Sequence, residues 1–421
     1  MAPTPRIPII WPVAWRDAKA LDLLNGSPVN CLILDPSVPA ALKQAAGAKG
    51  FDCPDVRWTA WGETDWAQGR FFPIGGGIWP GAAAAQNRQE GGPTGAPWVD
   101  ANGWIVQLAR ARAPKGSELW LNSDPPEETR TISPAQYLLA LSEIWAYGAR
   151  RPVWLAPHHA VEALEGVGEG AAAWTAINAL LRWQLARDAW MAYQPVASLL
   201  VVSDFTGPNE YMAGEVLNLS ARQGIAFTPV ETGRLDDASF KDKRAALYVD
   251  QTPAPQDVAA RLRLFAESGG LLLAMKNTAA LFGELAPMQA THPRFDLFQF
   301  GKGRLAVAKQ DFDDPWVLAR DAHLLMSRRW DSIRLFNAGS LLAHHVIAPG
   351  GRSSLVHLLN YTGRPSANQV ALQIPSTARS AQMHTTAQPQ PATAMIHRRD
   401  GRLEIEIPPF PVHCVLELTH A

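Results

Sequence analysis

The chain has 421 residues, of which 47% are hydrophobic and 18% charged, and its formal net charge is −1. This length suits about two to four domains, and the composition is that of a folded protein rather than a disordered one. Acidic and basic residues are mixed without a basic stripe, which argues against nucleic acid and against an anionic membrane surface as partners. The balance fits a neutral sugar or another small polar molecule better.

No apolar stretch reaches the roughly 18 to 20 residues that cross a bilayer. The first residues lack the charged-then-apolar layout of a signal peptide, so we expect a cytoplasmic protein. The three cysteines, Cys31, Cys53 and Cys414, are sparse and far apart. This spacing argues against a disulfide framework and against a zinc site, and we expect neither a metal nor another cofactor.

Residues 1–195 alternate short apolar runs with helical patterns, which predicts a parallel sheet with helical crossovers. The candidate strands are Ile9–Trp11, Asn30–Asp35, Val56–Trp61, Phe71–Ile78, Glu118–Asn122 and Pro152–Ala156. The candidate helices are Ala18–Leu24, Pro39–Ala46, Gly103–Ala113, Pro134–Tyr147 and Ala171–Ala192. These strands are too few for an eightfold barrel, so we expect an incomplete or distorted TIM-like barrel, with an open α/β sheet as the alternative. Residues 82–102 are predicted to form a long loop.

Residues 196–312 have a different pattern. The near-continuous apolar run Val196–Ser203 is typical of a strand that is covered on both faces. Two strand–helix–strand units follow, with helices that end at Gly224 and at Gly269-Gly270. They predict a flavodoxin-like, doubly wound α/β domain.

Residues 313–421 begin with a predicted linking helix, Pro315–Arg329, and continue as short apolar runs separated by turns. Pro349-Gly350-Gly351 and Asp400-Gly401 lie where hairpins need turn residues. This pattern predicts an antiparallel β-sandwich, with a barrel as the alternative. The chain is thus predicted to be a three-part α/β protein with bounds of 1–195, 196–312 and 313–421.

Five stretches between residues 174 and 421 resemble parts of glycoside hydrolase family 42 β-galactosidases. Tyr193–Ser203, which follows a long helix, is similar to the junction between their barrel and their amidotransferase-like domain. The others resemble that second domain or the small C-terminal β-domain, and they are Leu264–Leu273, Phe300–Leu305, Val356–Tyr361 and Ile407–Val412.

The resemblance implies a carbohydrate-active protein, first of all a glycoside hydrolase, and homo-oligomers that form through the middle domain. True amidotransferases need a cysteine thiolate, and no cysteine lies between residues 54 and 413, so glutamine hydrolysis is not expected. The barrel half departs from the family because no Asn-Glu pair closes a barrel strand. The second hypothesis is therefore a catalytically silent relative that binds a glycan or acts as a scaffold.

Glycoside hydrolysis uses two carboxyl groups about 5 to 9 Å apart, and barrel enzymes place them at the carboxyl ends of strands. Asp124 follows its strand directly and precedes Pro125-Pro126, so it is the first candidate for a catalytic carboxyl. Asp100 and Glu63 are the candidate partners. A turn role for Asp124 and a helix N-cap role for Asp100 are the alternatives.

The same rim is expected to hold substrate-binding side chains. Tryptophan rings can stack on the C–H face of a pyranose, while amide and imidazole groups can bond to sugar hydroxyls. The candidates are Trp61, Trp79, Trp98, Asn122 and His158. Core packing is the alternative for the tryptophans.

Overall fold

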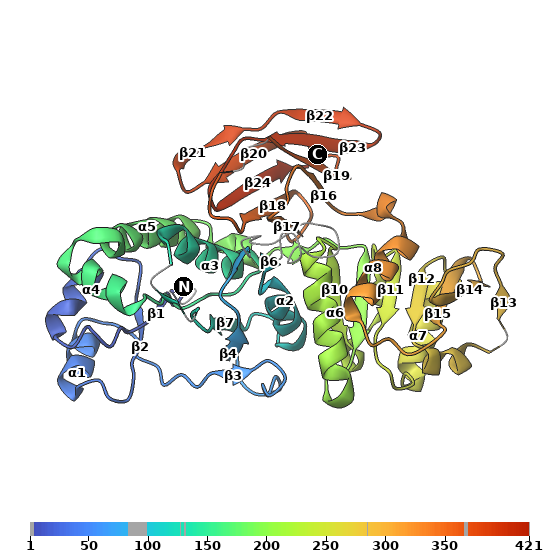
Figure 1. Cartoon of the computed structure of the whole chain (residues 1–421), viewed down its shortest axis with the longest axis horizontal. Coiled ribbons are helices and arrows are strands. Elements are labelled where there is room, and N and C mark those ends of the chain that lie inside the picture. Colours follow the sequence, from blue (N-terminus) through green and yellow to red (C-terminus); the bar gives the residue numbers. More distant parts are fainter. Residues whose placement is uncertain are drawn as a thin grey trace.

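The computed structural model describes residues 4–82, 99–126, 128–129, 132–283, 285–365 and 369–420. Three parts are visible: a first region (residues 4–192), a seven-stranded sheet beside it, and a β-sandwich that lies across both (Figure 1). Across these ranges the structure confirms a mixed α/β protein with several sheets, and their strands form no closed barrel. The division into separate domains at residues 195 and 312 remains a prediction. In the described ranges, no helix is long and apolar enough to cross a membrane.

The first region contains short parallel ladders rather than one continuous sheet. β1 pairs with β2, and β4 lies between β3 and β7. Isolated parallel bridges at Val153, Asp52 and Arg150 extend these ladders. The strands are β1 (Pro8–Ile10), β2 (Cys31–Ile33), β3 (Thr59–Ala60), β4 (Phe71–Gly77), β5 (Gly81–Ala82), β6 (Val99–Asp100) and β7 (Glu118–Ser123).

One face of these strands carries a small core of its own. It contains Cys31, Ile33 and Trp120, with Phe71 packed against them. The guanidinium of Arg6 lies 4.3 Å from the centre of the Phe71 ring and forms an ion pair with Glu118. This face is therefore filled by side chains, as the interior of a barrel is.

Helices cover the opposite face of the strands. They are the 3-10 helix η1 (Ala18–Leu24), α1 (Ala40–Ala48), α2 (Gly103–Arg112), α3 (Pro134–Ala146), α4 (Pro157–Glu165), α5 (Gly168–Leu185) and the 3-10 helix η3 (Asp188–Ala192). α3 begins where the sequence predicts, because Ser133 and Gln136 form a capping box around Pro134.

Four predicted elements need correction. Pro152–Ala156 is not a strand, because only Val153 forms a bridge before α4 begins at Pro157. In Val56–Trp61, only Thr59–Ala60 pairs with a neighbour. The helix predicted over Ala171–Ala192 divides after Leu185, and Asp188 then binds Arg150. Asp100 does not begin a helix, since it lies in β6 and pairs with β5.

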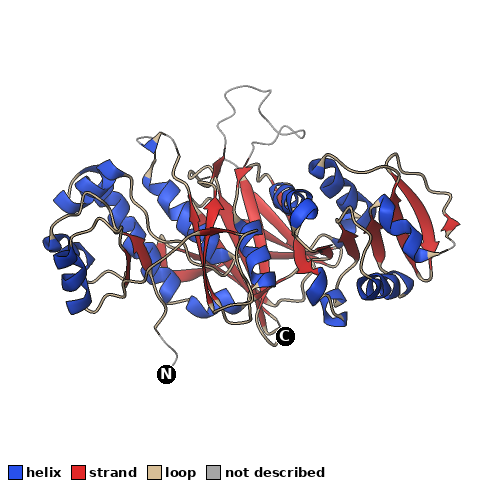
Figure 2. Cartoon of the chain, turned by 90° about the horizontal axis from the view of Figure 1, so that it is seen from below, coloured by secondary structure: helices blue, strands red, loops and turns tan. Residues whose placement is uncertain are grey.

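The seven-stranded sheet has the order β10-β9-β11-β12-β15-β14-β13, and its first five strands are parallel. Its side chains alternate between two cores: Val201 faces α6 and α8, whereas Val202 faces α7. Helices accordingly lie on both faces (Figure 2). The elements are β9 (Leu199–Ser203), α6 (Glu210–Arg222), β10 (Phe227–Glu231), β11 (Ala245–Tyr248), α7 (Gln256–Glu267), β12 (Leu271–Ala274), β13 (Ala286–Pro287), β14 (Phe295–Phe300), β15 (Gly303–Ala308) and α8 (Pro315–Met326).

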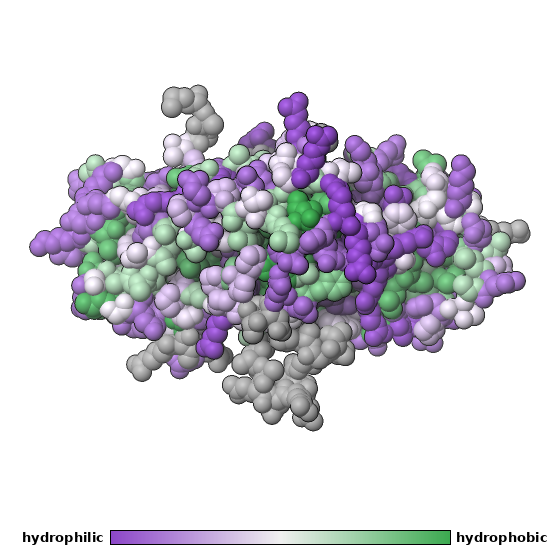
Figure 3. Space-filling view, turned by 90° about the horizontal axis from the view of Figure 1, so that it is seen from above, coloured by the Kyte–Doolittle hydropathy of each residue, from purple (hydrophilic) through white to green (hydrophobic). Residues whose placement is uncertain are grey.

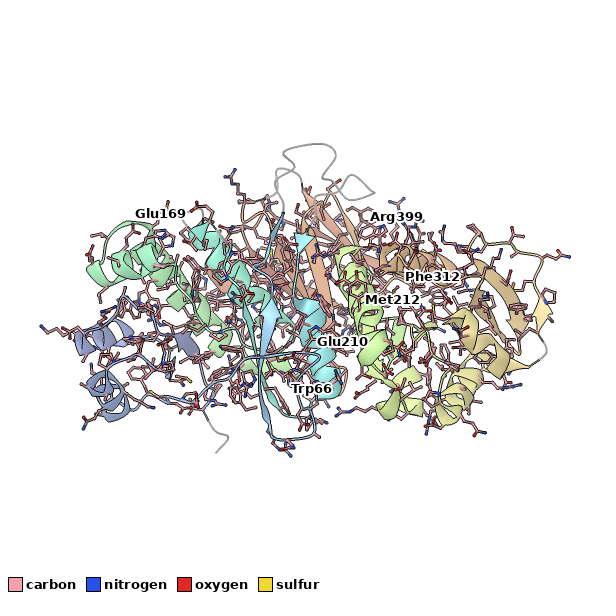
Figure 4. All side chains as sticks on the ribbon, turned by 60° about the horizontal axis from the view of Figure 1, so that its bottom comes forward. Trp66, Glu169, Glu210, Met212, Phe312 and Arg399 are labelled. Atoms are coloured by element: carbon pink, nitrogen blue, oxygen red, sulfur yellow. The ribbon has the colours of Figure 1, made fainter. Side chains whose placement is uncertain are left out.

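The sheet and the first region share one core. Ile105 and Leu108 of α2 are buried in the same cluster as Val216 of α6 and Phe227 of β10. Trp66 of the first region and Met212 of α6 also belong to this cluster, and Figure 4 shows both near the boundary. The two parts therefore share one continuous apolar core.

The β-sandwich consists of two antiparallel sheets with the orders β16-β19-β23-β22 and β21-β20-β24-β18-β17-β8. Leu372, Ile405 and Leu416 are fully buried between them. Its outer surface mixes hydrophilic and hydrophobic residues (Figure 3). The strands are β8 (Gln194–Pro195), β16 (Arg334–Phe336), β17 (Leu341–Ile347), β18 (Ser353–Asn360), β19 (Val370–Ile374), β20 (Ser380–Thr385), β21 (Gln388–Thr393), β22 (Ile396–Arg399), β23 (Arg402–Ile407) and β24 (His413–Thr419).

A buried carboxyl group connects the first region to the sandwich. Glu143 of α3 accepts hydrogen bonds from the Asn102 backbone amide (2.5 Å), the Asn102 side-chain amide (2.9 Å) and the Tyr361 hydroxyl (2.8 Å). Asn102 also bonds to both backbone groups of Ile78. Burial raises the pKa of Glu143, while the donors and the charge of Arg151 act in the opposite direction.

This network predicts the effect of one hydroxyl group. Tyr361→Phe removes the donor that the sandwich supplies to Glu143 and keeps the ring, so the free energy of unfolding should fall by about 1–2 kcal/mol. Urea unfolding measures this change. Tyr211→Phe, at an exposed tyrosine, is the control and should have no effect. Equal stability of the two variants would contradict the structural role of the network.

Candidate functional site

Aromatic side chains meet between the end of β4 and the start of α4. The Trp79 ring centre lies 5.6 Å from that of Trp154 and 5.8 Å from that of Tyr137. The Tyr137 ring in turn contacts His159 (5.7 Å), which contacts His158 (4.0 Å). Two of the predicted substrate-binding residues, Trp79 and His158, are therefore linked by a chain of ring contacts.

Arg151 connects this aromatic chain to β7. Its guanidinium lies 4.8 Å from the centre of the Trp79 ring and donates to the Ser123 hydroxyl and carbonyl. Ser123 stands between the predicted residues Asn122 and Asp124. The Asp124 amide donates to the Gly77 carbonyl (3.2 Å), which fixes its position beside the end of β4.

We call Trp79, Asn122, Asp124, Trp154 and His158 the mouth group. Asp124 is exposed, and the other four are partly exposed. The group contains two tryptophan rings, an amide, an imidazole and a carboxylate. The guanidinium of Arg151 lies over the Trp79 ring, and both tryptophans also pack against the core of the first region. This combination can hold a polar molecule by stacking and by hydrogen bonds.

The other predicted site residues lie toward the seven-stranded sheet. Trp61 packs against Trp104 (5.9 Å between ring centres) and lies next to Gly214 of α6. Trp61 therefore contributes to the core between the first region and α6. Asp100 forms an ion pair with Arg222 of α6 (3.2 Å). Glu63 is exposed in the turn after β3. In the same turn, a side chain at Gly62 would collide with the carboxylate of Glu210, the first residue of α6 (Figure 4).

The structure therefore divides the predicted site. Trp79 and His158 are linked through Tyr137 and His159, and Arg151 links Trp79 to Ser123, the chain neighbour of Asn122 and Asp124. Trp61, Glu63 and Asp100 instead lie at the contact with α6. Trp98 lies outside the described residues. Arg151, Tyr137 and Trp154 were not predicted. A signal for Trp154 was present, because the residue lies in the run that the sequence places at the rim.

Two small cavities lie away from the mouth group. Both include the Gly224–Ala226 turn, and the larger one, of about 30 Å³, is lined by His344 and His345 of β17. That space holds water but not a sugar ring. Among the described residues, no group of three His, Cys, Asp or Glu side chains could hold a metal ion.

A second polar cluster lies at the carboxyl ends of β9 and β11, where the strand order of the sheet reverses. Asp250 accepts hydrogen bonds from the Ser203 hydroxyl and the Asp204 amide. The Asn209 side-chain amide donates to Asp204 (3.1 Å) and to the Thr252 hydroxyl (3.3 Å). Open α/β sheets bind ligands at such points, but these groups already bond to one another.

The charge of Asp250 makes a prediction possible. Burial raises its pKa to about 6, although the Ser203 and Asp204 donors lower it. Well below pH 4 this carboxyl group is neutral in both the folded and the unfolded protein. As the pH rises from 4 through 6 it ionises more readily in the unfolded protein, so the free energy of unfolding falls by about 3 kcal/mol in total. Asp250→Asn cannot ionise, so the stability of wild type relative to this variant should fall between pH 4 and pH 7. Urea unfolding at both pH values measures the difference; a constant difference would contradict the prediction.

In sequence, no family model and no curated protein matches this chain. Solved structures do resemble it. The α-L-fucosidase isoenzyme 2 from Paenibacillus thiaminolyticus is 12% identical, over 75% of this chain and 62% of its own, with a TM-score of 0.52. Gan42B, a GH42 β-galactosidase from G. stearothermophilus, is 12% identical over 75% and 56%, with a TM-score of 0.50. A rhamnosidase from Novosphingobium sp. PP1Y is 13% identical over 79% and 34%, with a TM-score of 0.51.

This chain thus spans less than two thirds of the length of each of these proteins. At such identities the likeness concerns the fold. The chain has a multidomain α/β fold like that of glycoside hydrolases, which agrees with the resemblance seen in its C-terminal half.

Proposed function

We propose that this chain is a carbohydrate-active protein that binds a neutral glycan at the mouth group without cleaving it. The observation that carries the proposal is the contact between Trp79 and Trp154, two partly exposed residues. Asp124 is exposed, and its backbone amide bonds to Gly77, two residues before Trp79. Pyranose rings stack on such faces, and carboxylates accept hydrogen bonds from sugar hydroxyls. The fold shared with three carbohydrate-cleaving enzymes supports the same class of ligand.

Binding is favoured over cleavage by the contacts of the candidate carboxylates. A glycoside hydrolase needs a second carboxyl group that faces the first across one sugar. Asp100 is held by Arg222, and Glu63 lies in the turn that adjoins α6, so each has surroundings different from those of Asp124. Hydrolysis with Asp124 as acid or base is the competing proposal.

Binding to a panel of neutral oligosaccharides, followed by calorimetry with the tightest of them, tests the proposal. Asp124→Asn keeps the shape of the side chain but removes its charge, and it should weaken binding about tenfold. Asp65→Asn, at another exposed carboxylate near the strand ends, is the matched control and should leave affinity unchanged.

The same samples decide between binding and cleavage. Release of nitrophenol from aryl glycosides by the wild type, lost in Asp124→Asn, would replace this proposal by the hydrolase. Binding to none of the oligosaccharides, together with no hydrolysis, would refute a carbohydrate function at this site.

A further inference from the structure

Histidines gather on one face of the six-stranded sheet of the sandwich. His344 of β17 pairs across the strands with His357 of β18. Val415 of β24 pairs with both His357 and His384 of β20, so the three histidines lie in one row. His413 precedes Val415 by two residues and shares its face, because side chains alternate along a strand. We call these four residues the histidine layer.

Aromatic side chains of the first region cover this layer. Trp145 of α3 contacts His357 (5.6 Å) and His413 (6.0 Å). The other contacts join Trp183 of α5 to His413 (5.7 Å), Trp190 of η3 to His384 (5.1 Å) and Tyr147 to His344 (4.0 Å). No histidine of the layer is more than 8% exposed, so the contact is nearly dry.

The layer has few hydrogen-bond acceptors. His357 and His413 bond to each other through Nδ1 and Nε2 (3.2 Å), and His384 Nε2 bonds to Glu417 (3.0 Å). His357 Nε2, His384 Nδ1 and His413 Nδ1 have no partner among the described residues. A neutral imidazole needs one acceptor at most, whereas an imidazolium has two N–H donors to satisfy. Apart from His384, which lies against Glu417, the layer therefore suits neutral rings, because the described residues offer the other three no carboxylate.

Few charges face the layer from the surrounding elements. Glu417 of β24 lies against His384, and Arg187, between α5 and η3, lies over the rings of Trp183 and Trp190. Besides burial, the charge of His345 on the same strand lowers the pKa of His344, and the charge of His420 lowers the pKa of His345. At α3, burial and the charge of Glu143 raise the pKa of Tyr147. Among the described residues, Glu417 is the one carboxylate that lies against a histidine of the layer, and it does so at the edge formed by His384.

We propose that the histidine layer is an acid-sensitive contact, in which protonation of the histidines releases the sandwich from α3, α5 and η3. In the docked state, burial lowers the pKa of His344 and of His413 to about 3, and it lowers that of His357 well below its usual range. Once released into water, the same rings titrate near 6.5. Each such histidine therefore shifts the equilibrium toward release by about tenfold for every pH unit below 6.5, until its docked pKa is reached.

The full-length protein tests this proposal between pH 7.5 and pH 4. X-ray scattering reports the radius of gyration, near-UV circular dichroism reports the packing of tryptophans, and far-UV circular dichroism reports secondary structure. We expect a reversible rise in radius and a loss of near-UV signal, with a midpoint between pH 6 and pH 4, while the far-UV signal stays constant. No transition in this range, or simultaneous loss of all three signals, would overturn the proposal.

Matched variants identify the groups that titrate. His357→Phe combined with His413→Phe removes both partners of one hydrogen bond and keeps two rings, so the midpoint should fall by about half a pH unit or more and the transition should become less steep. His397→Gln, on the other sheet of the sandwich, should not move it. If the double variant does not fold, His344→Phe, which keeps a ring on Tyr147, replaces it. An unchanged midpoint in the folded variant would refute the role of the layer.

Discussion

Glu143 carries a carboxyl group that water does not reach, and its hydrogen bonds tie together segments that are distant in sequence. One set of bonds fixes Asn102 at the start of α2, and through Asn102 the backbone at Ile78 after β4. Another reaches Tyr361 at the end of β18. A buried acceptor with several donors tolerates little displacement, because each lost bond leaves a desolvated polar group. The position of the sandwich over the strand ends depends on this constraint.

The elements that the sequence predicts best are those with strong local signals. Val196–Ser203 is a near-continuous apolar run, and such a run indicates a central parallel strand wherever the rest of the chain lies. The start of α3 follows from Ser133-Pro134 alone. In the tail, Pro349-Gly350-Gly351 and Asp400-Gly401 mark two hairpins that the structure contains, β17–β18 and β22–β23. β16 and β21 lack such signals and were not predicted.

Elements defined by distant contacts could not be predicted. Pro152–Ala156 has the composition of a strand, yet its neighbours offer it a single bridge, and Pro157 then begins a helix. The same limit applies to the site. Asp100 looks like a helix cap in sequence, but its partner Arg222 is more than a hundred residues away. With 16 tryptophans in the chain, composition cannot tell which rings are partly exposed, as Trp79 is, and which are buried, as Trp120 is.

The segment that connects the first region to the seven-stranded sheet also contributes a strand to the β-sandwich. Gln194–Pro195 form β8, which is the edge strand of the six-stranded sheet and pairs with Val346 and Ile347 of β17. The edge strand of this sheet therefore comes from a segment about 150 residues before its partner β17 in the chain. During synthesis, that segment has to wait until β17 has been made before it finds its partner, and closing so long a loop is a slow step. A fragment cut at Lys309 would leave β8 without its ladder, and a fragment that begins at Pro315 would expose β17 as an open edge, the kind of edge along which sheets of separate molecules join.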